Sequence, residues 1–341
     1  MYWKLVTHLW NYLPIGDEVS YSRRIFGSLL VLSLAAICIG RFFKRPRIFR
    51  FGVILCVSVL VLWGYLYVTR PAWLRIAAQP VVPAPTFGEI NWVTRAPGLE
   101  SAEVDLRVKD EVVDHVVFVR LDPHRYRFSV HWDPGGSRTA EDWQRELDAA
   151  VVVNGSYFGT RNEPLTPLRL AGRPAGPAVY ESDHGAFVTD GERVDIIDLR
   201  HQDVFKAIGA YPEAMVSYPL LIDANGENRA RETKVWLASR NFIGLDRVGR
   251  VVIGTTQTGF FTLHRLGEFL KAAPLGLRVA LNFDGGPLVS QVVHAGRFTR
   301  EFHGKAEMTN NSDVLRALWH AHVDPPSPLP IVLVAVPINR S

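Results

Sequence analysis

The sequence predicts an α+β fold that is rich in strands, has a few inserted helices and is preceded by a two-helix transmembrane hairpin. Three observations support this prediction. Short strand-like runs recur between about residues 110 and 336, with turn residues between them. Few stretches in that region have helical spacing, so the regular strand–helix alternation of a parallel α/β sheet is missing. Before residue 70, two long apolar runs flank a basic stretch, as expected of a helical hairpin in a membrane.

The composition describes a folded protein with room for one large domain and an appendage, or for two modest domains. Of its 341 residues, 48% are apolar and 21% are charged, which excludes a disordered chain. The formal net charge of +4 arises from one basic stretch between the apolar runs. This stretch contains Arg41, Lys44, Arg45, Arg47 and Arg50. Because there is no basic stripe with interleaved aromatic residues, we expect no nucleic-acid partner.

The two cysteines, Cys38 and Cys56, both lie within the apolar runs, and the rest of the chain has none. The part that follows the runs therefore cannot form a disulfide framework or a thiolate metal site. This distribution is compatible with an oxidising compartment.

Residues 25–43 and 51–68 each approach the length that a helix needs to cross a hydrocarbon core. A cleaved signal peptide fits poorly, because the first run starts late and the second follows without a small-residue cleavage site. A buried hairpin of a soluble protein is the alternative. The basic stretch favours a cytoplasmic turn by the positive-inside rule. We therefore expect residues 1–69 to anchor the chain in the inner (cytoplasmic) membrane, with the C-terminal domain on the periplasmic or extracellular side.

Residues 70–99 are rich in proline and are expected to form a linker, and residues 100–341 are expected to form the folded domain. Alternating or apolar runs bounded by turn residues predict the strands of this domain. The expected strands are Val112 to Leu121, Tyr126 to Trp132, Ala150 to Val153, Gly185 to Thr189, Val194 to Ile197, Val216 to Ile222, Phe242 to Leu245, Val251 to Thr255, Val279 to Phe283 and Leu329 to Val336.

Two stretches of the domain have helical spacing. Thr139 to Ala149 begins with Thr139 and Asp142, which have the spacing of a capping pair. Thr262 to Ala273 is amphipathic, with its leucines and Phe269 on one face. We expect both to be helices inserted between strands.

Three small groups of polar residues and glycines lie at the ends of predicted strands. Singly, each group has an ordinary structural explanation, because Asn-Gly and Asp-Gly pairs form turns and a strand arginine usually faces solvent. A carboxylate at a rigid strand end is nevertheless well placed for chemistry where glycines let the backbone approach a ligand. The groups are Asn154 and Gly155 with Glu163 a short loop further on, Arg240, and Asn282, Asp284, Gly285 and Gly286.

The order and spacing of these groups resemble the phosphodiester glycosidase family, which includes the lysosomal enzyme that uncovers mannose 6-phosphate by removing a capping N-acetylglucosamine. Its Asn-Gly-Gly-aromatic-Phe and Gly-Glu-Cys segments are similar to Asn154-Gly-Ser-Tyr-Phe158 and Asn162-Glu163-Pro164. Its Arg-Thr-Ala-Ile-Gly and Asn-Leu-Asp-Gly-Gly segments are similar to Arg240-Asn-Phe-Ile-Gly244 and Asn282-Phe-Asp-Gly-Gly286. A Gln-Ser-Tyr-Pro-like segment of bacterial members is similar to Val216-Ser-Tyr-Pro-Leu220. The resemblance covers roughly residues 100 to 336.

The resemblance implies a hydrolase that cleaves a sugar 1-phosphodiester in a phosphorylated glycan or glycolipid. Arg240 would then be a bidentate clamp for the phosphate. Asp284 and Glu163 would be the two carboxylates at the sugar, one activating water or attacking and the other assisting or binding hydroxyls. Together with the predicted anchor, this implies a role in envelope or exopolysaccharide metabolism.

The same resemblance implies further contacts to the substrate. Asn154 and Asn282 would bind sugar hydroxyls or orient the carboxylates. Backbone N–H groups at Gly285 and Gly286 would line the phosphate. We also expect Gly155 to belong to the binding site.

The chain departs from the family pattern at several positions. Ser156 replaces a glycine, Asn241 replaces a threonine, and Leu288 stands where the family usually has a serine. The last change removes a hydroxyl that could touch the phosphate, unless Ser290 substitutes for it. A non-catalytic glycan-binding or polysaccharide-assembly protein of the same fold is therefore the alternative function.

Two further candidates also have an ordinary structural explanation. Thr258 follows a strand and either contacts the ligand or belongs to a polar turn. The polar segment from Thr299 to Ser312, which contains His303 and Glu307, is either a lid over the site or a surface loop.

The sequence does not determine whether the protein requires a metal. His320 and His322, with Asp324 nearby, could suggest a metal site, but histidines at this spacing near a chain end are usually surface or packing residues. The sequence assigns no cofactor and no oligomeric state. It also leaves inversion or retention open, because it does not determine the distance between the carboxylates.

Overall fold

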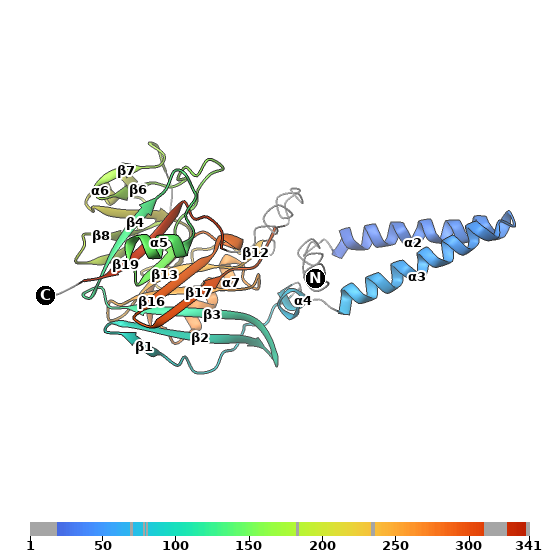
Figure 1. Ribbon diagram of the computed structural model, residues 1–341, viewed down its shortest axis with the longest axis horizontal. Helices are drawn as coiled ribbons and strands as arrows, with labels where there is room; N and C mark the ends of the chain where they lie inside the picture. The colour runs from blue at the N-terminus through green and yellow to red at the C-terminus, as the bar shows by residue number, and fades with distance from the viewer. Residues whose placement is uncertain are drawn as a thin grey trace.

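The computed structural model consists of a helical hairpin and a strand-rich globular part (Figure 1). It describes residues 19–68, 71–77, 79, 81–181, 184–232, 236–309 and 326–338. Side chains are described for these residues except for 19–27, 66–68 and 308–309. The metal candidates His320, His322 and Asp324 lie outside the described residues, as do positions 310–312 of the segment that begins at Thr299.

Two helices, α2 (Val19–Phe42) and α3 (Pro46–Val68), lie side by side and form the hairpin. Pro46 occupies the first position of α3, where its missing N–H is not needed and its fixed φ suits a helix. Near the turn, Gly40 lets the two backbones meet, because a Cβ at this position would lie 2.3 Å from the Phe49 nitrogen. The hairpin therefore depends on a small residue at its tip.

One of the described helices is long and apolar enough to cross a membrane, over Pro46–Tyr65. The apolar part of α2 within the same described residues, Ser28–Phe42, is shorter. Large apolar side chains on both helices face outward, and Val31, Ile54 and Val61 are each 65% exposed. Length and composition thus support the predicted transmembrane hairpin for one of its two helices.

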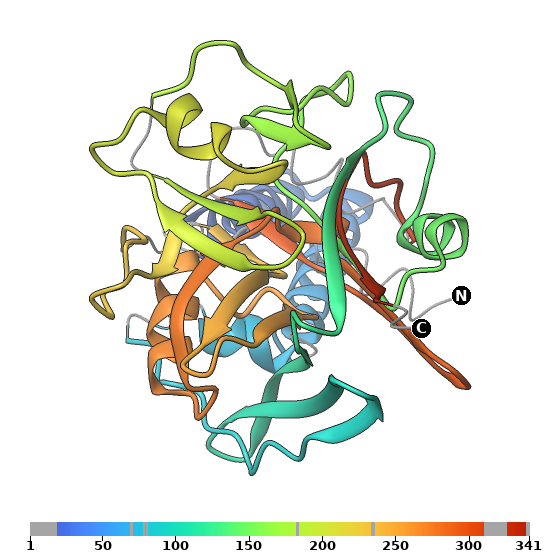
Figure 2. The same cartoon turned by 90° about the vertical axis from the view of Figure 1, so that its left-hand side faces the viewer.

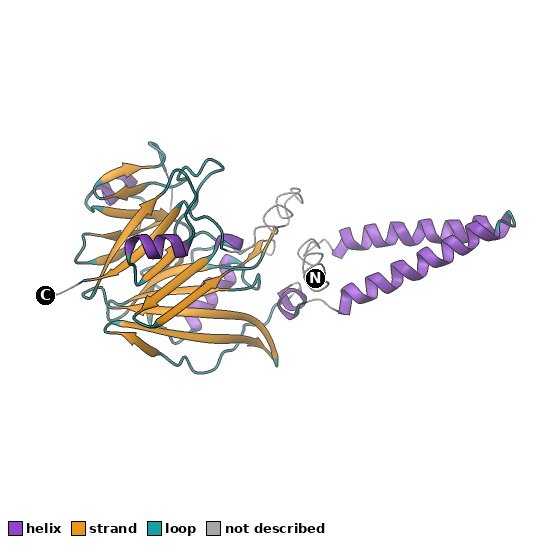
Figure 3. Cartoon of the chain, viewed as in Figure 1, coloured by secondary structure: helices purple, strands orange, loops and turns teal. Residues whose placement is uncertain are grey.

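The globular part is built mainly from antiparallel strands, with few helices between them (Figure 3). This observation confirms the α+β class. Its largest sheet has seven strands in the order β1-β2-β3-β14-β13-β15-β11. These strands are β1 (Val93–Ala96), β2 (Leu99–Val108), β3 (Glu111–Leu121), β14 (Val251–Thr256), β13 (Asn241–Asp246), β15 (Leu277–Asn282) and β11 (Leu220–Ile222).

Both faces of the seven-stranded sheet are buried. On β3, Val119 and Leu121 pack in one core cluster, whereas Phe118 packs in a second. On β13, Ile243 and Phe242 divide between the same two clusters. Since successive strand residues point to opposite faces, the sheet lies between the two clusters and forms the centre of the domain.

Three smaller sheets and several helices surround this centre. One sheet has the order β17-β16-β5-β19-β4, and α5 packs on its strands β5 and β16. A second, β7-β6-β10-β8-β9, lies with α6 at the opposite end of the domain from β1 and β2 (Figure 2). Strands β12 and β18 form a two-stranded sheet, and α4 and α7 pack on β3 and β11. The bounds are β17 (Phe298–His303), β16 (Ser290–Ala295), β5 (Val151–Asn154), β19 (Ile331–Pro337), β4 (Tyr126–Trp132), α5 (Ala140–Leu147), β7 (Arg173–Ala175), β6 (Leu168–Leu170), β10 (Glu213–Ser217), β8 (Gly185–Thr189), β9 (Val194–Asp198), α6 (Val204–Gly209), β12 (Trp236–Ala238), β18 (Glu307–Thr309), α4 (Ala72–Ala77) and α7 (Leu263–Ala272).

Both predicted helices of the domain are present, as α5 and α7. The Thr139 hydroxyl accepts a hydrogen bond from the Asp142 N–H at 3.2 Å, and Asp142 Oδ2 accepts one from the Thr139 N–H at 2.9 Å. This reciprocal pair confirms the capping box of α5. The Thr262 hydroxyl caps α7 by accepting from the Arg265 N–H at 3.1 Å.

Two predicted segments of the domain take a different form in the structure. The expected strand from Val216 to Ile222 is split into β10 and β11, which belong to different sheets. Pro219 lies between them and has no N–H to donate to a strand ladder. The segment from Thr299, expected to be a lid or a surface loop, instead forms β17 and β18 within its described residues. Its first half is ordered by pairing with β16 along the whole length of β17.

The proline-rich segment that was expected to be a linker packs against the domain in its described residues. It contains α4 and β1, and Leu74 and Ile76 of α4 are each only 4% exposed. Phe87 and Trp92 pack against the second core cluster. Apolar residues between the prolines thus cover one face of the seven-stranded sheet.

Candidate active site

Asp284 follows the end of β15, and its backbone is held by the end of β5. Its N–H donates to the Gly155 carbonyl at 2.9 Å, and its own carbonyl accepts from Asn154 Nδ2 at 2.8 Å. Two of the predicted strand-end groups therefore meet directly. A Cβ at Gly155 would lie 2.7 Å from Ile331 Cγ2 and 2.9 Å from Met215 Sδ, so this close approach requires glycine.

Asn154 is buried, and both the nitrogen and the oxygen of its side-chain amide are hydrogen-bonded within the protein. Its Oδ1 accepts from Asn241 Nδ2 at 3.0 Å and from the Ser290 N–H at 3.0 Å. The asparagine therefore joins the end of β5 to the starts of β13 and β16. Of the two predicted roles, this arrangement fits the orientation of Asp284 better than direct contact with a sugar.

Arg240 lies just before β13 and is only 4% exposed. Its Nε donates to the Phe261 carbonyl at 3.1 Å, and its Nη2 donates to the Trp236 carbonyl at 2.8 Å. Its Nη1 faces Gly285, where a Cβ would lie 3.3 Å away. Two of the five guanidinium N–H groups thus position the side chain, which leaves Nη1 as the group nearest the Gly-Gly loop. Burial lowers the pKa of Arg240 to about 10, so the group stays cationic at neutral pH.

The two glycines after Asp284 use their N–H groups within the protein. Gly285 donates to Asp284 Oδ1 at 2.8 Å, and Gly286 donates to the Ser239 carbonyl at 2.8 Å. These N–H groups therefore stabilise the loop itself. They were expected to line the phosphate of the substrate. Gly286 has a φ of 76°, which a residue with a side chain rarely adopts.

Glu307 on β18 is the second carboxylate of this region. A Cβ at Gly286 would lie 2.6 Å from Glu307 Oε2, and Glu307 Oε1 accepts from Trp236 Nε1 at 3.0 Å. Burial raises the pKa of Asp284 to about 7, and the charge of Glu307 adds to this increase. The Gly285 N–H and the Arg240 charge act in the opposite direction. Asp284 is thus a carboxyl group that can exchange a proton near neutral pH.

Glu163 lies apart from these groups, in the turn after β5. Its side chain is 41% exposed, and its Oε2 accepts from the Arg161 N–H at 2.9 Å. A Cβ at Gly159 would lie 2.5 Å from Glu163 Oε1, so the carboxylate folds back over its own turn. Among the described residues no contact joins it to Asp284.

The side chains of Asn282 and Thr258 donate hydrogen bonds within the protein. Asn282 is fully buried at the end of β15, and its Nδ2 donates to Tyr157 Oη at 2.8 Å. Thr258 donates from its hydroxyl to the Val113 carbonyl at 2.8 Å and from its N–H to Asp114 Oδ1 at 2.9 Å. Its contacts match the polar-turn alternative.

An aromatic stack that the sequence motifs did not predict adjoins Asp284. The rings of Tyr157 and Tyr218 lie 4.2 Å apart, and those of Tyr218 and His184 lie 4.3 Å apart. Burial and the Asp284 charge raise the pKa of Tyr157 well above its usual value, so its hydroxyl stays protonated. The aromatic positions in the Asn154 and Val216 segments are the signal that could have indicated these tyrosines.

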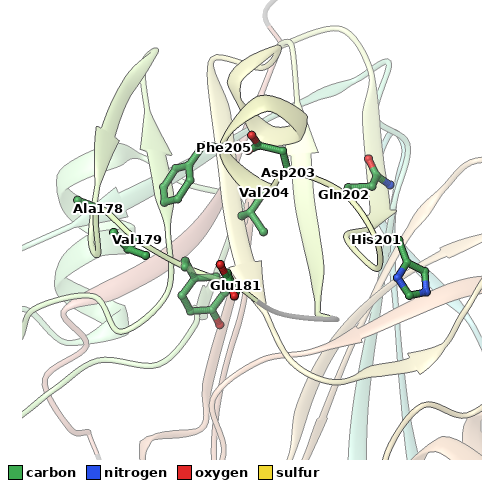
Figure 4. Close-up of a pocket in the computed structure, with 9 residues that line it drawn as sticks. Ala178, Val179, Glu181, His201, Gln202, Asp203, Val204 and Phe205 are labelled. Carbon is green, nitrogen blue, oxygen red and sulfur yellow. The ribbon is translucent and has the colours of Figure 1, made fainter.

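An open pocket of about 790 Å³ lies beyond this stack (Figure 4). Tyr180 lines it, and Tyr180 Oη lies 2.8 Å from Nδ1 of His184, the outer ring of the stack. None of the nine predicted site residues is among its lining residues, which are Ala178, Val179, Tyr180, Glu181, His201, Gln202, Asp203, Val204 and Phe205. Among the described residues, the group that could hold a metal also lies elsewhere, between α5 and β17.

Residues 148–317 match the family model of phosphodiester glycosidases, and this range includes all the strand-end groups. The domain belongs to the phosphodiester glycosidase family. The resemblance predicted from the strand-end motifs is thereby confirmed. Nearly half of the chain lies within the match, which begins directly after α5 and ends beyond β18.

One solved structure extends the similarity of this phosphodiester glycosidase domain to its fold. The catalytic domain of zebrafish N-acetylglucosamine-1-phosphodiester alpha-N-acetylglucosaminidase, auto-inhibited by its pro-peptide, is 15% identical with a TM-score of 0.50. The alignment covers 79% of this chain and 94% of the zebrafish chain. A hypothetical protein from Synechocystis is 14% identical, with a TM-score of 0.46 over 73% of this chain and 64% of its own. No curated protein sequence matches this chain.

Proposed function

We propose that this member of the phosphodiester glycosidase family is a membrane-anchored hydrolase that cleaves a sugar 1-phosphodiester bond in an envelope or exopolysaccharide glycan or glycolipid. The observation that carries the proposal is the grouping of Asp284, Arg240 and Glu307 around the Gly-Gly loop. It combines a carboxyl group that titrates near neutral pH, a fixed cation and a second carboxylate. These are the groups that an oxocarbenium-like transition state with a phosphate leaving group requires.

In the proposed reaction, Arg240 binds the phosphate and Asp284 acts on water. Ionised Asp284 takes a proton from a water molecule whose oxygen forms a bond with the anomeric carbon. The bond between that carbon and the phosphate oxygen breaks, and its electron pair leaves with the phosphomonoester. Arg240 stabilises this charge, so the leaving group needs little acid assistance. The buried setting of Arg240 strengthens the effect.

The second carboxylate has two candidates. Glu307 is placed to stabilise the positive charge that develops on the sugar, because it lies beside the same loop as Asp284. Glu163 is exposed, and we propose for it a contact to an outer part of the substrate. Asn154, Gly155 and Asn282 are proposed to position the reacting groups from behind.

Membrane anchoring is proposed from the hairpin. Apolar side chains cover its outer surface. Exposing such a surface to water is unfavourable, whereas contact with the hydrocarbon of a lipid bilayer is not. The basic residues at its turn favour the cytoplasmic side. The catalytic domain would then lie on the periplasmic or extracellular side of the inner membrane, facing envelope substrates.

The proposal can be tested on the full chain in detergent or nanodiscs with a panel of sugar 1-phosphodiesters. Release of free reducing sugar is the readout. We expect turnover by the wild type and by Asp195→Asn, whose carboxylate pairs with Arg278 away from the site at 2.9 Å. We expect none above background from Asp284→Asn. Equal turnover by Asp284→Asn and the wild type would contradict the assignment.

A specific observation favours the alternative of a non-catalytic glycan-binding or polysaccharide-assembly protein. Leu288 packs against the apolar cluster formed by Ala140 and Trp143 of α5, so no hydroxyl is available at this position of the loop. Under this alternative, the chain binds anionic glycans without turnover, and Asp284→Asn leaves the binding constant unchanged. Turnover that is lost in Asp284→Asn would eliminate it.

A further inference from the structure

We propose that Glu141, Glu301 and His303 form a zinc site between α5 and β17. One carboxylate oxygen from each glutamate and one ring nitrogen of the histidine lie within 4.8 Å of one another. None of these three residues is among the groups placed around Asp284, and the proposal does not depend on the proposed hydrolase activity.

The backbone brings the three side chains together. Glu301 and His303 are two residues apart on β17, so both point to the same face of the sheet. Val292, which pairs with Glu301 across the strands, packs in the apolar cluster with Ala140 and Trp143 of α5. The helix therefore covers this face.

Glu141 has an unusual environment for a carboxylate. Its side chain is 13% exposed, and neither of its oxygens is solvent-accessible or accepts a hydrogen bond from the described residues. The ring nitrogen Nε2 of His303 lies 3.1 Å from Oε1, without the alignment of a hydrogen bond. A bound cation, like a protonated His303 ring, would offset the cost of burying this carboxylate.

The second nitrogen of His303 supports the assignment. His303 Nδ1 lies 3.1 Å from the hydroxyl oxygen of the buried residue Ser290. When Nδ1 donates its hydrogen to this oxygen, Nε2 presents a lone pair toward Glu141. In the neutral ring these two acceptors, 3.1 Å apart, repel each other, and either a second proton on the ring or a bound cation between them removes the repulsion. Metal-bound histidines have this arrangement, with one nitrogen on the metal and the other held by an oxygen.

The donor set points to zinc among the divalent ions. One imidazole and two carboxylates are typical zinc ligands, and a water molecule would complete a tetrahedral site. Calcium and magnesium prefer sites made only of oxygen atoms. The ion would fasten α5 to β17 and, through Ser290, to the strand that starts beside Asn154.

The test uses the full chain, stripped of metal with a chelator, and zinc chloride as the probe. We expect calorimetry to show one equivalent of zinc bound, with a higher midpoint of thermal unfolding, and no comparable binding of magnesium or calcium. Glu301→Gln, an exposed position that should not affect folding, is expected to abolish binding. Ser290→Ala is expected to weaken binding by about 10- to 100-fold, the usual cost of losing a group that orients a metal ligand.

The matched control is Glu146→Gln. Glu146 lies on the same helix but pairs with Arg138 at 2.6 Å, outside the cluster, so zinc binding should be unchanged. Circular dichroism of each variant verifies folding. Failure of the folded wild type to bind zinc would overturn the proposal, and so would equal binding by Glu301→Gln and the wild type.

Discussion

Asn154 Nδ2 donates a hydrogen bond to the backbone carbonyl of Asp284 at 2.8 Å, across 130 residues of sequence. This bond connects the first and last of the three strand-end groups. Through its Oδ1, the same asparagine also holds Asn241, beside Arg240. The ordered motifs along the chain thus correspond to one hydrogen-bonded centre.

Asp284→Asn is expected to reduce kcat/KM for a sugar 1-phosphodiester by about 100- to 10,000-fold, the usual range for loss of a general base. The amide keeps the shape of the side chain but cannot accept the proton of water. Steady-state kinetics measure the effect, with Asp195→Asn as the control. A loss of the same size in both variants would assign the effect to folding.

Activity is expected to rise as the pH increases through about 7, because the proposed base is active only when Asp284 is ionised. Glu307→Gln removes a nearby negative charge, so the pKa of Asp284 should fall and the acid limb of the kcat/KM profile should move to lower pH. Glu163→Gln is the control and should leave this limb in place. Activity that falls as pH rises through 7 would instead make Asp284 a general acid.

Asn154→Ala is expected to lower the free energy of unfolding by about 1–3 kcal/mol, because it leaves buried donors at Asn241 and Ser290 without their acceptor. It should also lower kcat more than it raises KM, since it releases the backbone of Asp284. Urea denaturation and kinetics measure the two effects. An unchanged stability would show that water replaces these hydrogen bonds.

Asp114 should make stability depend on pH. Its Oδ1 accepts N–H groups of His115, Gln257 and Thr258 at 2.8 to 2.9 Å, and burial raises its pKa to about 7. In the unfolded chain the carboxyl group of Asp114 has a pKa of about 4. Between these values the folded state holds the extra proton, so the free energy of unfolding falls as pH rises and levels off above 7.

Asp114→Asn is expected to flatten this dependence between pH 4 and 7, as measured by urea denaturation at several pH values. Asn can keep the three acceptor contacts through its oxygen, so the fold should be retained. Asp284 contributes in the same direction, and the double variant with Asp284→Asn should be flatter still. If the free energy of unfolding changed with pH by the same amount in the wild type and in Asp114→Asn, Asp114 would not be the group responsible.

The orientation of the hairpin can be tested with alkaline phosphatase fused after Val68, because this reporter is active only outside the cytoplasm. We expect activity, since the basic turn of the hairpin favours the cytoplasmic side. A fusion at Lys44, in the turn, is the control and should be inactive. The reverse pattern would place the domain in the cytoplasm.

Much of the fold could be predicted because its signals are local. The capping pair of α5, the apolar face of α7 and the central strands β3, β13 and β15 all follow from short-range periodicity. Some strands with many exposed polar residues were missed. β2 and β17 have exposed polar residues on one face. They form strands because they pair with neighbouring strands, and their own composition does not predict this.

By itself, the sequence determined the family, the strand-end motifs and the carboxylate at Asp284, since each depends on residues that are close together in the chain. Only the tertiary structure decided which groups surround that carboxylate. It brings Glu307 to Gly286 and leaves Glu163 on an exposed turn. The reason is that β18 pairs with β12, a contact between strands some 70 residues apart that no local pattern specifies.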